Sequence, residues 1–293
     1  MPEPEPAKPR LFDRVSTGLL HLLPQHLLAA GMYRLMRSTQ PWLKQQLITR
    51  ISRRYRIDMG DAEQQDPTSY PSFNAMFTRA LKPGARPIAE GMLVSPADGR
   101  ISQVGTIRGD ALLQAKGHEY ELLALLAGDK QRAAAFRDGL FATVYLSPRD
   151  YHRVHIPFAG MLESMVFVPG DLFSVNEATT QLVPGLFARN ERVICHFSSV
   201  LGPMAVILVG AIFVGSIETV WHGEVRAQRG QPTKWVYRGD RRLRFDAGAE
   251  IGRFNMGSTV IILLPAGSAT WADTLGPGTP LKMGQAIGQP LRP

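Results

Sequence analysis

The sequence predicts an α+β protein in which N-terminal amphipathic helices are followed by a mainly β, sandwich- or barrel-like domain. Two observations support this class. Up to about residue 55, apolar residues recur one helical turn apart. After Leu93 the chain consists of short apolar runs broken by Gly, Pro and Asp, which is typical of strands and turns. With 293 residues, 44% of them hydrophobic, the chain can bury the core of one large domain or two small ones.

Three regions follow from these patterns. Residues 1–10 are rich in proline and are expected to be disordered. Residues 11–60 are expected to be a basic amphipathic helical region that associates with membranes. Residues 61–293 are expected to be the mainly β domain, with a helical insert over 122–136. The helices expected in the N-terminal half cover 11–23, 26–37, 42–55 and, because Phe73, Phe77 and Leu81 are one turn apart, 73–81.

The positive charge of the chain is concentrated in its N-terminal part. Residues 8–56 contain ten basic residues and one acid, whereas the formal net charge of the whole chain is only +8. Basic amphipathic helices that carry aromatic residues, here Tyr33, Trp42 and Tyr55, can lie in a membrane interface and attract anionic headgroups. The alternative is a helical subdomain packed on the core, with the arginines as its solvated face. Nucleic-acid binding is a weaker third reading, because no nucleic-acid motif accompanies the charge.

Several classes are excluded or disfavoured. The only cysteine, Cys195, cannot form an intrachain disulfide or a cysteine metal cluster. The N-terminus lacks the features of a secretory signal. The longest apolar stretch, 203–214, is too short to span a bilayer, so no transmembrane helix is expected.

Ser258 is the first candidate for chemistry. It follows Gly257 and directly precedes the apolar, β-branched run Thr259–Leu264, which is expected to be a buried strand. Because glycine has no Cβ, the Gly257–Ser258 peptide can adopt backbone angles that other residues resist. The serine hydroxyl could then be held against a carbonyl, including that of its own preceding residue. A Gly-Ser turn before a core strand is the simpler alternative.

Asp98, in Pro96–Gly99, and the histidines of Asp150–Pro157 could complete a serine–histidine–aspartate site, although almost every protein contains these residue types. His152 and His155 are three apart and cannot share one face of a regular strand, so the segment must bend for both to reach one site. No metal site is expected, because no further ligands are suitably spaced around these histidines. A charged island, 190–192, is expected to be a surface ion pair.

Taken together, several motifs resemble those of bacterial phosphatidylserine decarboxylases, which depend on a pyruvoyl group. The similarity runs from about Phe73 to Leu264 in the family's order and more loosely through the N-terminal region. This chain has Met256 where the family usually has leucine, a change expected to matter little. The motifs are Pro96–Gly99, Lys116–His118, Tyr145–His155, Pro169–Asn176, Asn190–Arg192, Val209–Ala211 and Gly257–Thr259.

The resemblance implies an enzyme that cleaves its own chain. Ser258 Oγ would attack the Gly257 carbonyl, with His155 as the base and Asp98 orienting it. Cleavage would give a large β chain, 1–257, and a small α chain, 258–293, whose N-terminal Ser258 becomes a covalent pyruvoyl group.

The same resemblance implies the reaction of the processed enzyme. The pyruvoyl group would decarboxylate phosphatidylserine to phosphatidylethanolamine and carbon dioxide, a step in phospholipid biosynthesis. His152 is the expected residue for decarboxylation or reprotonation, and His118 is the other candidate.

The implied partners are phosphatidylserine, an anionic membrane surface and a second copy of the processed protein in a homodimer. The expected location is peripheral, on the cytoplasmic side of the cell membrane. Three alternatives stay open. A serine hydrolase or acyltransferase would use the same three residues without cleaving its chain. A pyruvoyl decarboxylase for a soluble amino acid would have no use for the basic helices. A non-enzymatic, membrane-binding β-sandwich would tolerate Ser258→Ala.

Overall fold

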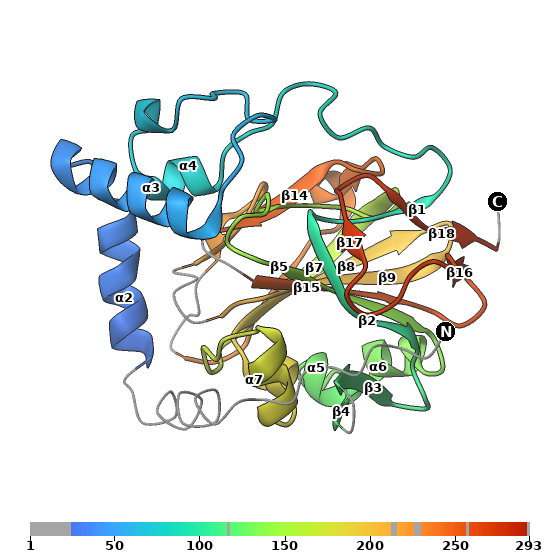
Figure 1. The fold of residues 1–293 in the computed structure, drawn as a ribbon. Coiled ribbons are helices and arrows are strands. Elements are labelled where there is room, and N and C mark those ends of the chain that lie inside the picture. The colour runs from blue at the N-terminus through green and yellow to red at the C-terminus, as the bar shows by residue number, and fades with distance from the viewer. Residues whose placement is uncertain (1–24, 116–117, 212–215, 226–229, 256–257, 292–293) are drawn as a thin grey trace.

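The computed structural model describes residues 25–115, 118–211, 216–225, 230–255 and 258–291. The proline-rich segment 1–10, the helix expected over 11–23, and both Met256 and Gly257 lie outside the described residues. The α+β class is confirmed, because a few N-terminal helices precede a domain of mostly antiparallel sheets (Figure 1). In the described part of the chain, no helix is long and apolar enough to cross a membrane.

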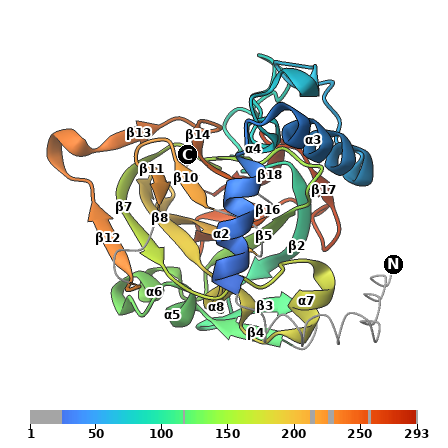
Figure 2. The same cartoon turned by 90° about the vertical axis from the view of Figure 1, so that its left-hand side faces the viewer.

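Two of the predicted N-terminal helices are present. They are α2 (Gln25–Met36) and α3 (Pro41–Tyr55), and α3 begins with a proline at its first helical position, where the missing N–H is not needed. Figure 2 shows α2 crossing one side of the β domain. A short 3₁₀ turn (Pro67–Ser69) and α4 (Phe73–Phe77) follow, and Ser72 caps α4 through its hydroxyl.

These helices bury a small core of their own. Its buried members are Met36 of α2, Ile48 of α3 and Phe73, Met76 and Phe77 of α4. We call the region 25–81 the arm. The alternative interpretation of the basic region was a helical subdomain. The helices of the arm do pack on one another around this small core.

The helix α4 is shorter than expected. It ends at Phe77, and Thr78 already departs from helical backbone angles. Leu81 instead forms an isolated antiparallel bridge with Ala62. The one-turn spacing of Phe73 and Phe77 was therefore a helix signal, but that of Leu81 was coincidental.

The centre of the β domain is a nine-stranded sheet in the order β12-β7-β8-β9-β15-β5-β2-β17, with β13 also paired to β7. Six of these strands form its core: β2 (Gly99–Thr106), β5 (Leu140–Leu146), β7 (Gly160–Val168), β8 (Arg192–Ser199), β9 (Gly202–Val209) and β15 (Ser258–Leu264). The remaining members are β12 (Thr233–Val236), β13 (Leu243–Phe245) and β17 (Pro280–Leu281).

Three smaller sheets complete the domain. One contains β11 (Gly223–Val225), β10 (Ile217–Thr219), β14 (Glu250–Phe254) and β6 (Arg153–His155) in that order. The second contains β1 (Leu93–Val94), β18 (Ala286–Pro290) and β16 (Ala269–Trp271). The third pairs β3 (Ala111–Ala115) with β4 (His118–Glu121).

The strand β15 lies in the interior of the large sheet, between β9 and β5. All seven of its residues are buried, as its apolar β-branched sequence predicts. Ser258 is its first residue and pairs with Leu146 at the end of β5. The predicted serine is thus fixed at one end of the most enclosed strand of the sheet.

The helical insert expected over 122–136 is present, but it is divided into two helices. Two short helices, α5 (Leu122–Leu125) and α6 (Lys130–Phe136), are separated by Ala127 and Gly128, both with positive φ. Helix formation cannot continue through this left-handed backbone. Two further short helices, α7 (Glu177–Leu182) and α8 (Leu186–Arg189), are present that the sequence patterns did not predict.

Candidate functional site

Ser258 is fully buried, and its hydroxyl has no hydrogen-bond partner among the described residues. The neighbouring Thr259 hydroxyl is buried and unpartnered as well. Buried hydroxyls are nearly always bonded, because an unpaired one costs free energy. An unpartnered Ser258 Oγ at the start of a rigid strand is therefore free to react with a group brought to it.

Asp98 lies just before β2 and is buried, with an exposed fraction of 3%. Arg86 donates to both carboxylate oxygens, from Nε to Oδ1 at 2.9 Å and from Nη2 to Oδ2 at 2.6 Å. The Met283 N–H donates to Oδ1 at 2.9 Å, and Lys282 Nζ lies 3.2 Å from Oδ2. Burial raises the pKa of Asp98, but these donors together lower it below its ordinary value. Asp98 is held as a carboxylate.

The backbone at Asp98 depends on the glycine that follows it. A Cβ on Gly99 would lie 2.3 Å from the Tyr145 carbonyl oxygen, so any other residue would push β2 away from β5. The turn sequence Pro96–Gly99 was therefore more than a turn signal, since its glycine is needed for close strand packing.

His155 is the last residue of β6 and is buried. Its Nδ1 lies 2.7 Å from the Gly248 carbonyl oxygen, which can only accept, so Nδ1 carries the proton. Its Nε2 is then the acceptor, and it lies 3.2 Å from the Tyr151 hydroxyl. Desolvation lowers the pKa of His155, so the ring is neutral near pH 7 and Nε2 is available as a base.

Gly248 orients His155 from a left-handed turn. Its φ is +78°, and a Cβ there would lie 2.5 Å from Ile88. The turn directs its carbonyl toward His155 Nδ1 and fixes the tautomer of the ring.

His152 immediately precedes β6 and is completely buried. Its Nδ1 is 2.9 Å from the Asp150 carbonyl oxygen, so this nitrogen also carries the proton, while Nε2 has no partner within the described part of the chain. The ring packs on Phe77 of α4, with 4.0 Å between ring centroids. Desolvation is the main cause that lowers the pKa of His152 to about 3, so this ring is neutral too.

Backbone contacts bring these segments to one region. The His155 N–H donates to the Pro96 carbonyl, two residues before Asp98, at 2.8 Å. The Phe254 N–H donates to the His152 carbonyl at 3.0 Å, at the end of β14 that leads to Ser258. The Asp98 charge acts on both histidines, raising the pKa of each. His152 lies just outside the strand that holds His155, and a bend that brings both rings to one site stays a prediction.

The direct partners differ from those predicted. No hydrogen bond joins Asp98 to His155 among the described residues. The Asp98 carboxylate accepts from Arg86 instead, and His155 Nδ1 donates to the Gly248 carbonyl oxygen. The role of Asp98 as the orienting residue stays a prediction. His118 begins β4 in the separate two-stranded sheet and forms no hydrogen bond with the site residues in the described part of the chain.

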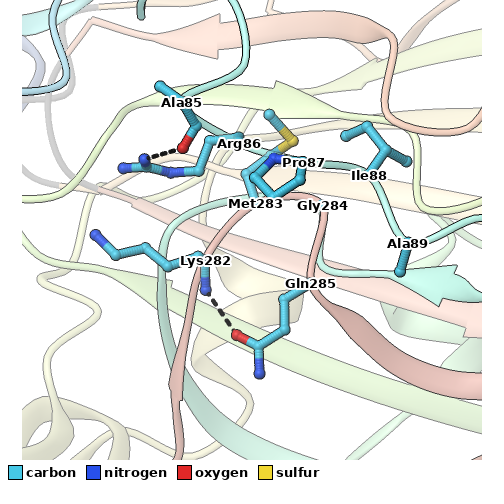
Figure 3. Close-up of a pocket in the computed structure, with 9 residues that line it drawn as sticks. All are labelled: Ala85, Arg86, Pro87, Ile88, Ala89, Lys282, Met283, Gly284 and Gln285. Atoms are coloured by element: carbon cyan, nitrogen blue, oxygen red, sulfur yellow. Dashed lines mark hydrogen bonds between the residues drawn. The ribbon is translucent and has the colours of Figure 1, made fainter.

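A cavity of about 450 Å³ lies next to the two cationic side chains that contact Asp98. Residues 85–89 and 282–285 line it (Figure 3). The Ala89 N–H donates to the Gly284 carbonyl oxygen at 2.9 Å and joins the two segments. Arg86 and Lys282, the two cations that contact Asp98, line the cavity. If the chain is cleaved before Ser258, residues 282–285 belong to the small chain and Arg86 to the large one.

The segment before Ser258 is anchored by Asn255, which is 2% exposed. Asn255 Nδ2 donates to Ser216 Oγ at 2.5 Å, and its Oδ1 accepts from Asn74 Nδ2 at 3.1 Å. Ser216 Oγ in turn donates to Glu224 at 3.0 Å. Tyr33 of α2 and Arg37, which directly follows this helix, donate to the same carboxylate at 2.9 and 2.6 Å. These contacts form a continuous path from the arm to Asn255.

Sequence reasoning missed several of these residues. Arg86, Lys282 and Met283 lie in segments with no motif signal, whereas Tyr151 lay inside the histidine motif and could have been singled out. The charged island at 190–192 is not a surface ion pair, which corrects that expectation. Arg192 is 2% exposed and donates to backbone carbonyls of α5 and α8 and of Asn190, which is itself buried.

The fold and this site define a mainly β protein with a buried serine at the start of a central strand, a buried carboxylate and two buried, neutral histidines. The phosphatidylserine decarboxylase family matches residues 73–289, and a second family description, PSD, matches 15–56. The chain therefore belongs to the phosphatidylserine decarboxylase family, as the motifs predicted.

Three curated relatives, each named phosphatidylserine decarboxylase proenzyme, illustrate the similarity. The protein of Methylococcus capsulatus is 55% identical over 94% of this chain and 96% of its own length. The protein of Azotobacter vinelandii is 53% identical over 94% of this chain and 98% of its own. The protein of Bordetella avium is 50% identical over 95% of both chains. The similarity thus includes the arm as well as the β domain.

Proposed function

We propose that this protein cleaves its own chain between Gly257 and Ser258 and then decarboxylates phosphatidylserine to phosphatidylethanolamine and carbon dioxide. The observation that carries the proposal is the buried, unpartnered hydroxyl of Ser258 at the start of β15. Membership of a family whose relatives are named proenzymes supports processing of the chain.

Self-cleavage begins when Ser258 Oγ attacks the Gly257 carbonyl carbon. A base takes the hydroxyl proton and returns it to the Ser258 nitrogen as the peptide C–N bond breaks, which leaves an ester. Loss of the Ser258 α-proton then expels the Gly257 carboxylate from Cβ and leaves dehydroalanine. Tautomerisation and addition of water release ammonia and leave a pyruvoyl group at the N-terminus of the small chain.

His155 is the proposed base. Its Nε2 is unprotonated in the tautomer that Gly248 imposes, and burial keeps the ring neutral. The Tyr151 hydroxyl, 3.2 Å from Nε2, must give up this contact or relay the proton. The Asp98 carboxylate, held charged by Arg86, favours the protonated ring that forms when His155 accepts a proton.

The surroundings of Ser258 fit a covalent pyruvoyl group. The position is buried, and no side chain of the described residues forms a hydrogen bond with Ser258 Oγ, so a keto oxygen there displaces no such bond. Such a group supplies a keto carbon that reacts with the substrate amine and an electron sink for the pair left behind by carbon dioxide.

His152 is the proposed proton carrier in turnover. Burial lowers its pKa to about 3 and keeps the ring neutral, and the unpartnered Nε2 is the nitrogen that would take up and carry a proton. The acidic ring that results can return this proton to the reacting carbon. The packing of His152 against Phe77 fixes the ring for this transfer.

The arm is the proposed membrane contact. Leu27 and Trp42 are 71% and 74% exposed, although they are large apolar residues. Exposed arginines accompany them on α2 and α3, which suits an interface with anionic lipid. The proposed location is therefore peripheral, on the cytoplasmic side of the cell membrane, and a homodimer of processed protomers is the proposed assembly.

The test is the intact mass of the purified protein under denaturing conditions. A small chain of residues 258–293 with the mass of an N-terminal pyruvoyl group is expected, together with the large chain 1–257. Ser258→Ala should give a single uncleaved chain without decarboxylase activity. A single chain that is active without cleavage would contradict the proposal and favour a serine hydrolase or acyltransferase.

A further inference from the structure

Arg79 is a buried cation with no anionic partner in the part of the chain that the structure describes. Its exposed fraction is 5%, and its single side-chain hydrogen bond runs from Nη2 to the Asp58 carbonyl oxygen at 3.3 Å. Its Nε and Nη1 have no partner. Desolvation lowers the pKa of the guanidinium, which reflects the cost of keeping this charge out of water. Unpaired donors on a buried charge call for an explanation.

A second buried arginine shows what a purely structural role requires. Arg192 is 2% exposed, and all three of its side-chain nitrogens donate to backbone carbonyl oxygens. The acceptors are those of Leu125, Ala188, Asn190 and Ala124, at 2.6 to 3.0 Å. Arg79 has a comparable burial without this set of acceptors.

The nearby acids do not supply the missing partner. Asp98 acts on Arg79 through its charge, but its oxygens already accept from Arg86 and Met283. Asp58 offers Arg79 only its carbonyl oxygen, and its Oδ1 accepts from the Gly60 N–H at 2.8 Å. The unused donors of Arg79 therefore suit an anion that the chain itself does not provide.

Arg79 lies beside the residues proposed for turnover. It comes two residues after Phe77, whose ring packs on His152, and Arg153 donates to the Thr78 carbonyl at 3.0 Å. The Arg79 charge contributes to the lowered pKa of His152. Both residues carry unpartnered polar atoms, namely Nε and Nη1 of Arg79 and Nε2 of His152.

We propose that Arg79 binds the phosphate of the substrate headgroup next to His152. This inference rests on the proposed function, because it assigns a substrate contact to that site. The headgroup carries two anions, a phosphodiester and the carboxylate that leaves. A cation on the carboxylate would stabilise the substrate more than the transition state, since that charge is lost as carbon dioxide forms. A cation on the phosphate stabilises both equally and lowers KM without opposing the reaction.

The experiment compares Arg79→Gln with wild-type processed enzyme, using phosphatidylserine in detergent micelles. Because uniform binding is lost, KM should rise about 10- to 100-fold, as expected for a charge-assisted hydrogen bond, with kcat within about threefold. Arg79→Lys should recover part of the loss. Arg132→Gln, which removes an arginine paired with Glu163 on the surface of the β domain, is the matched control and should leave KM unchanged.

Soluble headgroup analogues identify the anion. Glycerophosphoethanolamine has the phosphate but no carboxylate, and its inhibition constant should rise with Arg79→Gln by the same factor as KM. Inhibition by free serine, which has the carboxylate but no phosphate, should not change. If serine inhibition alone weakened, Arg79 would bind the carboxylate and the assignment would be wrong.

Thermal stability separates binding from a structural role. Removing an uncompensated buried charge should leave the melting temperature of Arg79→Gln equal to or above that of the wild type. An Arg79→Gln protein that melts lower and has an unchanged KM would overturn the inference. Failure of the wild type to form the pyruvoyl chain would instead overturn the proposed function, so the two outcomes are distinguishable.

Discussion

Arg86 donates hydrogen bonds to both carboxylate oxygens of Asp98, at 2.9 and 2.6 Å. Its Nη1 donates to Asp61 in the arm at 2.8 Å. The two acids differ in environment, since the side chain of Asp98 is 4% exposed and that of Asp61 is 55% exposed. One arginine therefore joins the buried carboxylate of the site to the surface of the arm.

This difference in exposure predicts that the loss of the Arg86–Asp98 pair and the loss of the Arg86–Asp61 pair change the free energy of unfolding unequally. Arg86→Met leaves Asp98 buried without its main counter-ion and should lower the free energy of unfolding by about 3–5 kcal/mol. Asp61→Asn breaks only a solvated pair and should cost less than about 1 kcal/mol. Urea unfolding of the uncleaved Ser258→Ala protein measures both. Equal effects would mean that Asp98 does not depend on Arg86.

The pH dependence of self-cleavage tests His155. The base acts when neutral, and burial lowers its pKa below the ordinary 6.5, so the rate should stay level from pH 8 to 6.5 and decline only at lower pH. Cleavage half-times of freshly translated chain, read from gels across this range, measure it. His155→Gln should slow cleavage about 100-fold or more. A rate already halved at pH 6.5 would contradict a depressed pKa.

The path from the arm to Asn255 predicts that the arm positions the cleavage segment. Glu224→Gln weakens the contacts with Arg37 and Ser216, and should slow self-cleavage about tenfold by loosening the geometry of attack. Glu163→Gln is the control, because it breaks a comparable pair with Arg132, at 2.8 Å, away from the site. Equal cleavage rates for the two variants would show that the path does not position the segment.

Acid stability should report the buried histidines. The pKa of His196, like that of His152, is lowered to about 3, chiefly by desolvation. As pH falls below 6.5, the unfolded chain binds protons that the folded chain does not, so stability is lost between about pH 6.5 and 3.

His196→Leu should reduce the slope of the unfolding free energy against pH in this range by up to one proton, roughly 1.4 kcal/mol per pH unit. Urea unfolding of the Ser258→Ala protein at pH 7, 6, 5 and 4 checks it. Replacing the exposed His222 with Gln is the control, and an unchanged slope for His196→Leu would refute the prediction.

Membrane binding is tested by point variants of the arm. Deletion of residues 1–56 would remove Met36 and Ile48 from the small core around α4 and would confuse folding with binding. Replacing Leu27 and Trp42 with Ser removes exposed apolar area only, and should weaken binding to anionic vesicles about tenfold or more. Leu291→Ser, also at an exposed apolar position, is the control in a flotation assay. Unchanged binding of the double variant would place the membrane contact elsewhere.

Much of the fold was predictable because its signals are local. The one-turn spacing in α2 and α3 and the β-branched run of β15 each follow from a few neighbouring residues. The divided helix at Ala127 and the early end of α4 were not predictable from periodicity, because backbone angles at single residues decide them.

The sequence by itself determined the family, the candidate residues Asp98, His152, His155 and Ser258, and the strand that fixes the serine, because motifs and periodicity are properties of consecutive residues. Only the tertiary structure decided how these groups are held and charged. Met283, 185 positions from Asp98, donates to its carboxylate, and Gly248, 93 positions from His155, fixes the tautomer of its ring. Such partners, and the burial that lowers both histidine pKa values, arise only when distant segments pack together, so no local pattern encodes them.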